Sequence, residues 1–250
     1  MARAVMQLLV SVANREDAEA ALDGGADIID TKDPGAGPLG PVILDVFAAV
    51  ASVVGGARPL SAALGEPRDE VEAATLAGAF TAAGAAFVKV GVRDGAGTTA
   101  TKRLLTATRH GAHGQVIAVA YADAGSDLTR MRIVEAAIHA GVAGVLLDTA
   151  DKHGPGLCDL LSPDGIDSWT SQVAAAGLIV ALAGKLTADD VARLWGRGAA
   201  IIGVRGAACE GGRAGRIARD RVRGLKAAAR ANLQVSTQWP PSGGPCAVGG

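Results

Sequence analysis

The sequence of 250 residues predicts one α/β domain, folded as a closed barrel of eight parallel strands with helices outside. Short apolar runs alternate with longer segments of helical periodicity over residues 1–231. The apolar runs are almost unbroken, as is typical of parallel strands buried on both faces. Several units also share the order helix, Gly-Ala or Ala-Gly, buried strand, as at 25–29, 84–88 and 198–202. These observations together predict a single (β/α)8 barrel, the TIM barrel.

The individual elements follow from the apolar pattern. The expected strands cover residues 6–12, 27–32, 58–63, 86–91, 115–121, 144–148, 178–183 and 200–205. The expected helices cover residues 14–23, 41–54, 69–83, 100–110, 127–140, 165–176, 187–197 and 215–231. Asn14 and Thr187 are favourable N-caps for two of these helices. The main alternative is a doubly wound open sheet, which is disfavoured because no Gly-x-Gly-x-x-Gly follows the first strand.

The last segment differs in composition from the rest of the chain. Residues 232–250 are rich in Pro, Gly and Ser and have no hydrophobic period. Such segments cannot bury enough apolar surface to offset the entropy of ordering. We therefore expect the barrel domain to cover residues 1–231 and residues 232–250 to form a flexible tail.

Composition excludes several classes of partner. The 24 Lys and Arg residues and 25 Asp and Glu residues give a net charge of −1, which excludes a globally basic nucleic-acid-binding protein. No apolar run reaches the ~18 residues of a membrane span, and the N-terminus lacks a signal-peptide cleavage site. The cysteines, three in number and widely spaced, indicate reduced thiols rather than a disulfide framework. We expect a cytoplasmic homo-oligomer, with the basic segment 213–230 either at its interface or solvated.

Charged residues occur where several expected strands end, which is where TIM barrels carry their reactive groups. Two residues that are two positions apart point to the same face of a strand, so the D-x-K string of the second strand points into the barrel mouth. Each charged residue alone could be a solvated or turn residue, but a closed barrel would bring them together. The candidate catalytic residues are Asp30, Lys32, Lys89, Asp148 and Lys152.

Lysines in apolar strands have a specific chemical consequence. Burial lowers the pKa of a lysine, and the neutral amine can attack a carbonyl carbon to form a Schiff base. A neighbouring carboxylate and a second lysine can then transfer protons. Tyr121 and Asp123, at the end of the fifth strand, are further candidates for the site. We expect a small-molecule substrate.

The loops after the seventh and eighth strands predict a phosphate site. In this fold these loops often bind phosphate through exposed backbone N–H groups. The alternative is that their glycines serve tight turns only. The expected phosphate-binding residues are Ala183, Gly184, Gly203, Arg205 and Gly206. Lys185 could add charge, and a second phosphate could use Lys152 or Arg93. The histidines have no metal-binding spacing, so we expect neither a catalytic metal nor another cofactor.

Several of these strings occur together in one known family. They are GGADIIDTKDP at 24–34, KVG at 89–91, YAD at 121–123, LDT at 147–149 and GVRGAAC at 203–209. The sequence resembles the (5-formylfuran-3-yl)methyl phosphate synthases, also called 4-(hydroxymethyl)-2-furancarboxaldehyde-phosphate synthases, over about residues 7–230. The resemblance implies a TIM barrel that condenses two molecules of glyceraldehyde 3-phosphate. The product is a furan aldehyde phosphate for methanofuran and methylofuran biosynthesis, and phosphate and water are lost.

The resemblance also implies roles for the candidate residues. Lys32 would form the Schiff base and Lys89 would accept and donate the proton, supported by Asp30, Asp148 and Lys152. The sequence departs from the family pattern at Lys185, where a small hydroxyl residue is expected, and in the tail after residue 232. Two alternatives are another Schiff-base class I aldolase or phosphosugar lyase on the same barrel, and a non-catalytic protein that binds a phosphate ligand.

Overall fold

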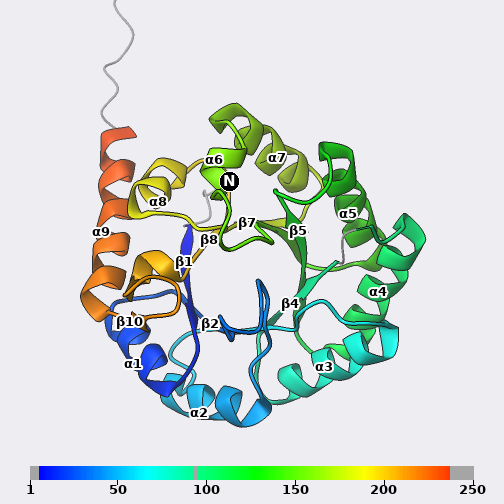
Figure 1. Cartoon of the computed structure of the whole chain (residues 1–250), viewed down its shortest axis with the longest axis horizontal. Coiled ribbons are helices and arrows are strands. Elements are labelled where there is room, and N and C mark those ends of the chain that lie inside the picture. Colours follow the sequence, from blue (N-terminus) through cyan, green and yellow to red (C-terminus); the bar gives the residue numbers. More distant parts are fainter. Residues whose placement is uncertain (1–5, 93–94, 237–250) are drawn as a thin grey trace, which may run out of the picture.

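The chain folds as a closed barrel of eight parallel strands (Figure 1). The computed structural model describes residues 6–92 and 95–236. Each strand pairs in parallel with the next, and β8 pairs with β1 to close the barrel. The strands are β1 Gln7–Val12, β2 Ile28–Thr31, β3 Leu60–Ala63, β4 Phe87–Gly91, β5 Gln115–Tyr121, β6 Gly144–Asp148, β7 Ile179–Leu182 and β8 Ile201–Val204. The predicted fold class is confirmed.

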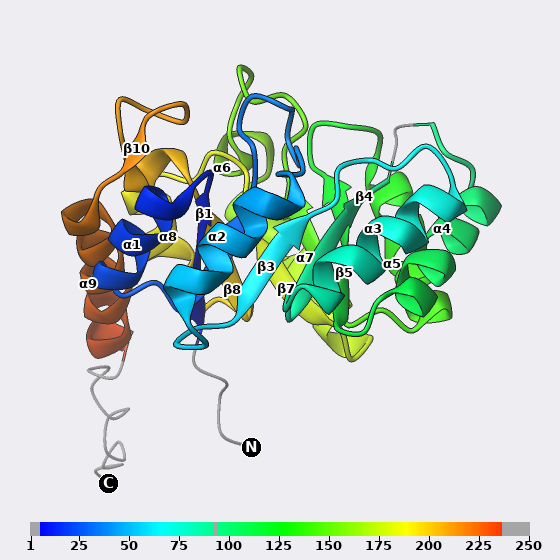
Figure 2. The same cartoon turned by 90° about the horizontal axis from the view of Figure 1, so that it is seen from below.

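The helices form a ring around the barrel (Figure 1). They are α1 Arg15–Asp23, α2 Leu44–Val54, α3 Glu70–Ala82, α4 Thr98–Gly111, α5 Asp127–Ala140, α6 Leu157–Leu160, α7 Pro163–Ala175, α8 Ala188–Leu194 and α9 Arg219–Ser236. The loops that follow the strands lie at the upper end of the barrel in Figure 2 and extend further than those at the opposite end. This upper end is the mouth.

Alternation along each strand creates two apolar layers. Outward side chains such as Leu8 and Ile29 pack against the helices, and both are fully buried. Inward side chains such as Leu9, Ile28 and Ile117 form a separate cluster within the barrel. Both faces of the strands are therefore buried, which explains their nearly continuous apolar sequences.

Local signals position several helix ends. The Asn14 side chain accepts a hydrogen bond of 2.9 Å from the Asp17 amide and so caps α1. Thr187 and Asp190 form a reciprocal capping box at the start of α8. The sequence did not predict the short helix α6 or the hairpin of β9 (Cys209–Glu210) and β10 (Arg216–Ile217), because elements this short have no measurable period.

The boundary of the predicted tail differs in the structure. Helix α9 continues to Ser236, so residues 232–236 belong to the helix and not to the tail. The reason is local, since these five residues include neither Gly nor Pro and the first helix breaker is Pro240. The rest of the predicted tail, residues 237–250, lies outside the described residues, and its flexibility stays a prediction.

Gly24, at the end of α1, is required by close packing rather than by its backbone angles. Its φ is −74°, but a Cβ at this position would lie 2.4 Å from the Cβ of Val222 on α9. We expect Gly24→Ala to lower the free energy of unfolding by about 1–3 kcal/mol, because overpacking forces the two helices apart. Urea denaturation followed by circular dichroism measures this.

Gly224 provides the matched control. It lies within α9, and a Cβ there would meet no atom within 4 Å. Gly224→Ala should leave the stability unchanged or raise it by up to about 1 kcal/mol, because alanine has the higher helix propensity. Equal effects of the two substitutions would contradict the packing argument.

Candidate active site

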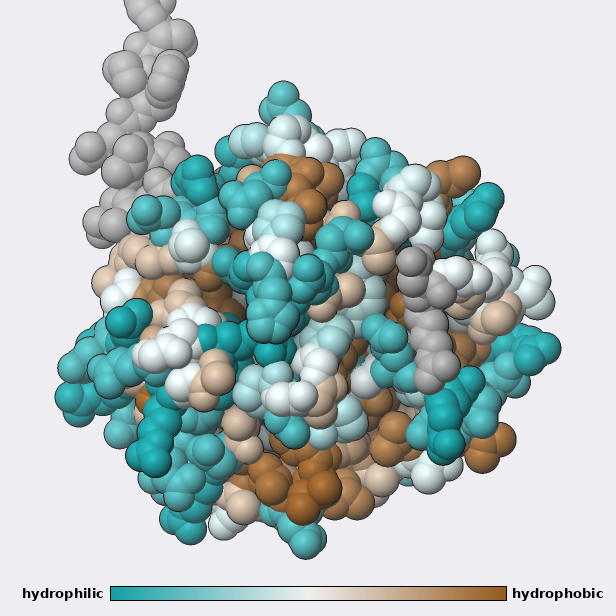
Figure 3. All heavy atoms as spheres, in the orientation of Figure 1, coloured by the Kyte–Doolittle hydropathy of each residue, from teal (hydrophilic) through white to brown (hydrophobic). Residues whose placement is uncertain are grey.

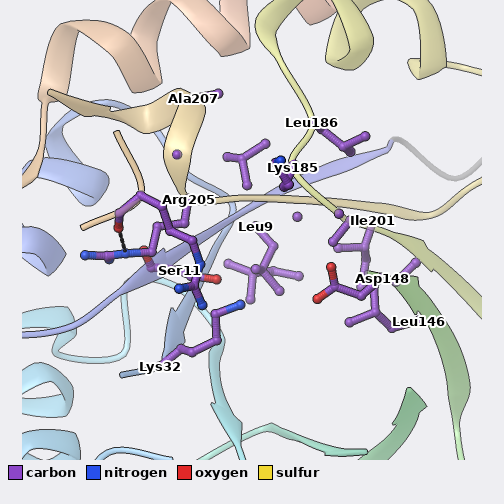
Figure 4. A pocket seen from close by; sticks show the side chains of 18 of the residues that line it. Leu9, Ser11, Lys32, Leu146, Asp148, Lys185, Leu186, Ile201, Arg205 and Ala207 are labelled. Atoms are coloured by element: carbon purple, nitrogen blue, oxygen red, sulfur yellow. Dashed lines mark hydrogen bonds between the residues drawn. The ribbon is translucent and has the colours of Figure 1, made fainter. Parts of the chain in front are cut away.

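The mouth of the barrel opens into a cavity of about 500 Å³. Figure 3 shows hydrophilic side chains around the centre of the mouth face. Inside, Lys32 and Asp148 point into the cavity from opposite sides (Figure 4). Deeper in the barrel the walls are apolar and include Leu9, Ile28 and Ile201. The cavity thus has a charged upper part and an apolar floor.

The first buried ion pair joins β2 and β4. Lys89 Nζ lies 2.7 Å from Asp30 Oδ2, and their side chains are 6% and 0% exposed. Ser11 Oγ, from β1, donates a further hydrogen bond of 2.7 Å to the same oxygen. A buried charge is costly unless it is paired and hydrogen-bonded, and here both conditions are met. The sequence therefore correctly predicted that Asp30 and Lys89 converge.

The second ion pair lies at the end of β6. Lys152 Nζ lies 2.7 Å from Asp148 Oδ1, and the Thr149 amide donates a hydrogen bond of 2.8 Å to the same oxygen. Burial alone raises the pKa of Asp148, but the charges of Lys152 and Lys32 outweigh it and hold the pKa below its usual value. Asp148 is therefore ionised at neutral pH, and it faces Lys32 with a negative charge.

Lys32 differs from these two lysines. It is 7% exposed, and its Nζ takes part in none of the hydrogen bonds and ion pairs described among residues 6–92 and 95–236. Burial lowers its pKa from 10.5 to about 7; the Asp148 charge opposes the decrease, and the charges of Lys89 and Lys152 add to it. A large fraction of Lys32 is then a neutral amine near pH 7, which is the form that attacks a carbonyl carbon.

The loops after β7 and β8 line the upper part of the cavity, as predicted for a phosphate site. Ala183, Gly184, Gly203, Arg205 and Gly206 are all among the lining residues. A single 3-10 turn, η1 (Gly206–Ala208), follows β8, and its own hydrogen bonds are donated by Ala208 and Cys209. The N–H groups of Gly206 and Ala207 are not used within that turn, which is the arrangement that binds anions at helix N-termini.

Arg205 lines the cavity, but its guanidinium group is occupied by protein acceptors. It donates to the carbonyl oxygens of Ser11, Arg213 and Gly215 at 2.8–3.2 Å. It also forms a buried ion pair of 3.1 Å with Asp17. Arg205 thereby holds the hairpin loop onto β1 and α1, and direct phosphate binding by Arg205 stays a prediction.

Three further cations line the cavity: Lys185 and Arg213 from the loops after β7 and β8, and Arg221 from the first turn of α9. Arg213 donates hydrogen bonds to the carbonyl oxygens of Pro34 and Gly37, which lie in the loop after Lys32. Burial lowers the pKa of Arg213, with a contribution from the Arg205 charge. Sequence reasoning missed Arg213 and Arg221 as site residues, because neither follows a barrel strand. Arg213 lies in the loop between β9 and β10, and Arg221 lies in the first turn of α9. Arg93 lies outside the described residues.

Tyr121 and Asp123 are not among the residues that line this cavity. Asp123 accepts hydrogen bonds of 2.7 Å from the backbone N–H groups of Ala150 and Asp151, and so holds the loop that carries Lys152. Tyr121 is buried, and burial together with the charge of Glu66 raises the pKa of its hydroxyl group. The geometry gives Asp123 a supporting role, and direct roles of both residues stay predictions.

Metal-binding clusters, membrane-spanning helices and reactive thiols are further features that could indicate a function. Within the described part of the chain, no group of three or more His, Cys, Asp and Glu side chains is arranged to hold a metal ion. No described helix is long and apolar enough to cross a membrane. Burial raises the pKa of Cys158 and of Cys209, so neither thiol is activated as a nucleophile. Cys246 lies outside the described residues.

The fold and the buried lysines at the mouth define a TIM-barrel enzyme. The sequence model of the 4-HFC-P synthase family matches residues 8–226. The (5-formylfuran-3-yl)methyl phosphate synthase of Methanothermobacter thermautotrophicus is 35% identical over 231 residues, which cover 88% of this chain and 98% of that protein. The synthase of the same name from Methanopyrus kandleri is 36% identical over 217 residues, covering 82% and 90%. The chain therefore belongs to the 4-HFC-P synthase family.

A solved structure supports the fold independently of sequence. The crystal structure of KGPDC from Streptococcus mutans superposes with a TM-score of 0.63 at 12% sequence identity, and covers 91% of this chain and 98% of that one. At this identity the likeness concerns the fold alone.

The environment of Lys32 leads to a prediction about its titration. With formaldehyde and cyanoborohydride, the rate of alkylation at Lys32 should rise with pH to half its maximum near pH 7, because only the neutral amine reacts. Asp148→Asn should move this midpoint to lower pH, since the Asp148 charge opposes the decrease in pKa. Peptide mass spectrometry at each pH measures the rate, with Lys102 on α4 as the internal reference. A midpoint for Lys32 near 10.5, the ordinary value of a lysine amine, would contradict the assigned environment.

Proposed function

We propose that this enzyme condenses two molecules of glyceraldehyde 3-phosphate into (5-formylfuran-3-yl)methyl phosphate. Atom balance requires the loss of one phosphate and two molecules of water, and no oxidant or reductant is needed. The name shared by the curated relatives supports the product. The product would supply the furan ring of methanofuran-type cofactors, as the family resemblance implies.

The observation that carries the proposal is the unpaired, desolvated amine of Lys32. Its Nζ attacks the aldehyde carbon of one triose, and loss of water leaves an imine. The protonated imine makes the hydrogen on the neighbouring carbon acidic. When that proton leaves, the electron pair of the C–H bond forms a C=C bond, and the π electrons of the C=N bond move to the nitrogen. The same electron sink serves both formation of the new C–C bond and expulsion of the phosphate group. One lysine therefore supports both difficult steps.

The two ion pairs provide the proton transfers. Lys89 and Asp30 form one donor–acceptor pair beside Lys32, and Lys152 and Asp148 form the other. A hydrogen-bonded ammonium and carboxylate can exchange a proton with the substrate at little cost, because the partner stabilises the charge that remains. In this proposal Lys89 passes its ammonium proton to Asp30, and its neutral amine then removes the substrate proton and later returns it. Asp148 and Lys152 assist loss of water from the imine precursor.

The cations at the mouth would hold the phosphate groups. The N–H groups of Gly206 and Ala207, with Lys185 and Arg213 nearby, form one anion-binding region at the loops after β7 and β8. The apolar floor of the cavity suits the part of the substrate that has lost its phosphate. The substrate pair would therefore lie with its charged ends toward the mouth.

The test uses glyceraldehyde 3-phosphate as the only substrate. The wild-type enzyme should release one phosphate for each furan formed, followed by phosphate assay and by ultraviolet absorbance. Borohydride should trap a covalent adduct on Lys32. Lys32→Arg should lower turnover by about 10⁴-fold or more, because an arginine cannot form the imine while its charge and length are similar.

The matched control is Lys102→Arg on α4, away from the cavity, which should keep full activity. Phosphate release without a furan chromophore would support a phosphosugar lyase, which is the alternative function on this barrel. Full activity of Lys32→Arg would overturn the imine mechanism.

A further inference from the structure

Two buried polar atoms, one on a residue that lines the cavity and one on its neighbour in the adjacent strand, have no hydrogen-bond partner among the described residues. They are Asp30 Oδ1 and Ser61 Oγ. Asp30 is 0% exposed and Ser61 is 1% exposed. All contacts of the Asp30 carboxylate described above, with Ser11 and Lys89, involve Oδ2. An unpaired buried acceptor or donor is costly, so two such atoms on adjacent strands indicate a binding function.

The strand register places these two atoms beside each other. Ser11, Asp30 and Ser61 are direct neighbours on β1, β2 and β3. Neighbouring strands are ~4.8 Å apart, and residues in register point to the same side of the sheet. Ser61 lines the cavity, as do Ser11 and Lys32, which lie close together in Figure 4. A hydroxyl group thus flanks Asp30 on each side, but only that of Ser11 is bonded to the carboxylate.

The chemistry of the two atoms defines the group that fits them. Ser61 Oγ can donate a hydrogen bond, and the carboxylate oxygen of Asp30 can only accept one. A carbonyl oxygen would satisfy Ser61 but not Asp30, and a phosphate would be repelled by the carboxylate. A hydroxyl group both accepts and donates, so it satisfies both atoms at once.

We propose that Ser61 and the free oxygen of Asp30 bind the hydroxyl group on the carbon next to the aldehyde carbon of the substrate. This assignment rests on the proposed function, in which Lys32 holds that aldehyde carbon as an imine. Lys32 directly follows β2, two residues after Asp30, and Ser61 lines the cavity as Lys32 does, so the imine and the hydroxyl site lie on the same side of the cavity. Ser61 is thus a substrate-binding residue that sequence analysis did not single out.

The assignment has a consequence for stereochemistry. Three substituents of the second carbon would be held: the imine carbon by Lys32, the hydroxyl group by Ser61 and Asp30, and the phosphate-bearing carbon toward the mouth. With three substituents held, the C–H bond of this carbon can point to only one side of the cavity, and that side differs between the two enantiomers. The hydroxyl site therefore selects the enantiomer whose hydrogen points at the base.

The test compares aldehydes that differ by this one hydroxyl group. Propanal and the two enantiomers of lactaldehyde are each incubated with the full-length enzyme and cyanoborohydride, and the adduct on Lys32 is quantified by mass spectrometry. One lactaldehyde enantiomer should reach half-saturation at a concentration about tenfold lower than propanal does, as expected for one buried hydrogen-bonded group. Ser61→Ala should abolish this preference and leave the half-saturation for propanal unchanged.

Thr31→Val is the matched control for a structural effect. Thr31 Oγ1 donates a hydrogen bond of 3.2 Å to the Ser61 carbonyl, so its loss perturbs the same two strands on their outer side. The control variant should keep the preference for lactaldehyde. A preference that survives in Ser61→Ala, or that Thr31→Val also removes, would overturn the assignment to Ser61. Absence of any Lys32 adduct in the wild type, with glyceraldehyde 3-phosphate included, would refute the imine mechanism and this assignment together.

Discussion

The site depends on an imbalance of charge among side chains that are almost fully buried. Lys32, Lys89 and Lys152 line the cavity, and among the described residues only Lys89 and Lys152 pair with a carboxylate, those of Asp30 and Asp148. In a low-dielectric interior the partner of each paired lysine offsets part of the cost of desolvation. Lys32 has no such partner among the described residues, so burial lowers its pKa and leaves a large fraction of neutral amine near pH 7.

The cavity itself results from small side chains inside the barrel. The lumen of a TIM barrel is usually filled by layers of bulky branched residues. Here the lining of the lumen includes the small residues Ser11, Ser61, Ala181, Ala183 and Gly203 beside larger ones such as Leu9 and Ile201. The space that a packed core would occupy is thus available to a substrate. The low aromatic content of the chain, 3%, is consistent with this use of small residues.

The loops at the mouth are tied to the barrel by two arginines, of which Arg205 is buried and Arg213 is half-buried. Arg205 links the loop after β8 to Ser11 and Asp17, and Arg213 links the same loop to the segment after Lys32. These contacts fix the position of the loop after β8, the predicted phosphate site, relative to the amine of Lys32. Precise spacing of this kind is needed when one molecule must contact both. The sequence predicts Arg205 to be a phosphate ligand, and in the structure Arg205 holds the loop after β8 against β1 and α1.

The sequence by itself determined the barrel, because buried parallel strands and amphipathic helices leave a periodic pattern that each segment carries alone. It also determined that Asp30, Lys32, Lys89 and Asp148 lie at strand ends and meet at one mouth. Only the tertiary structure decided which lysine pairs with which carboxylate. The Lys89–Asp30 pair, for example, joins residues 59 positions apart. Only the structure shows that Lys32 has no described partner and that Arg205 binds protein acceptors. The same holds for the Asp30 and Ser61 oxygens that lack a partner among the described residues. These features depend on side-chain geometry across strands, which no local sequence pattern records.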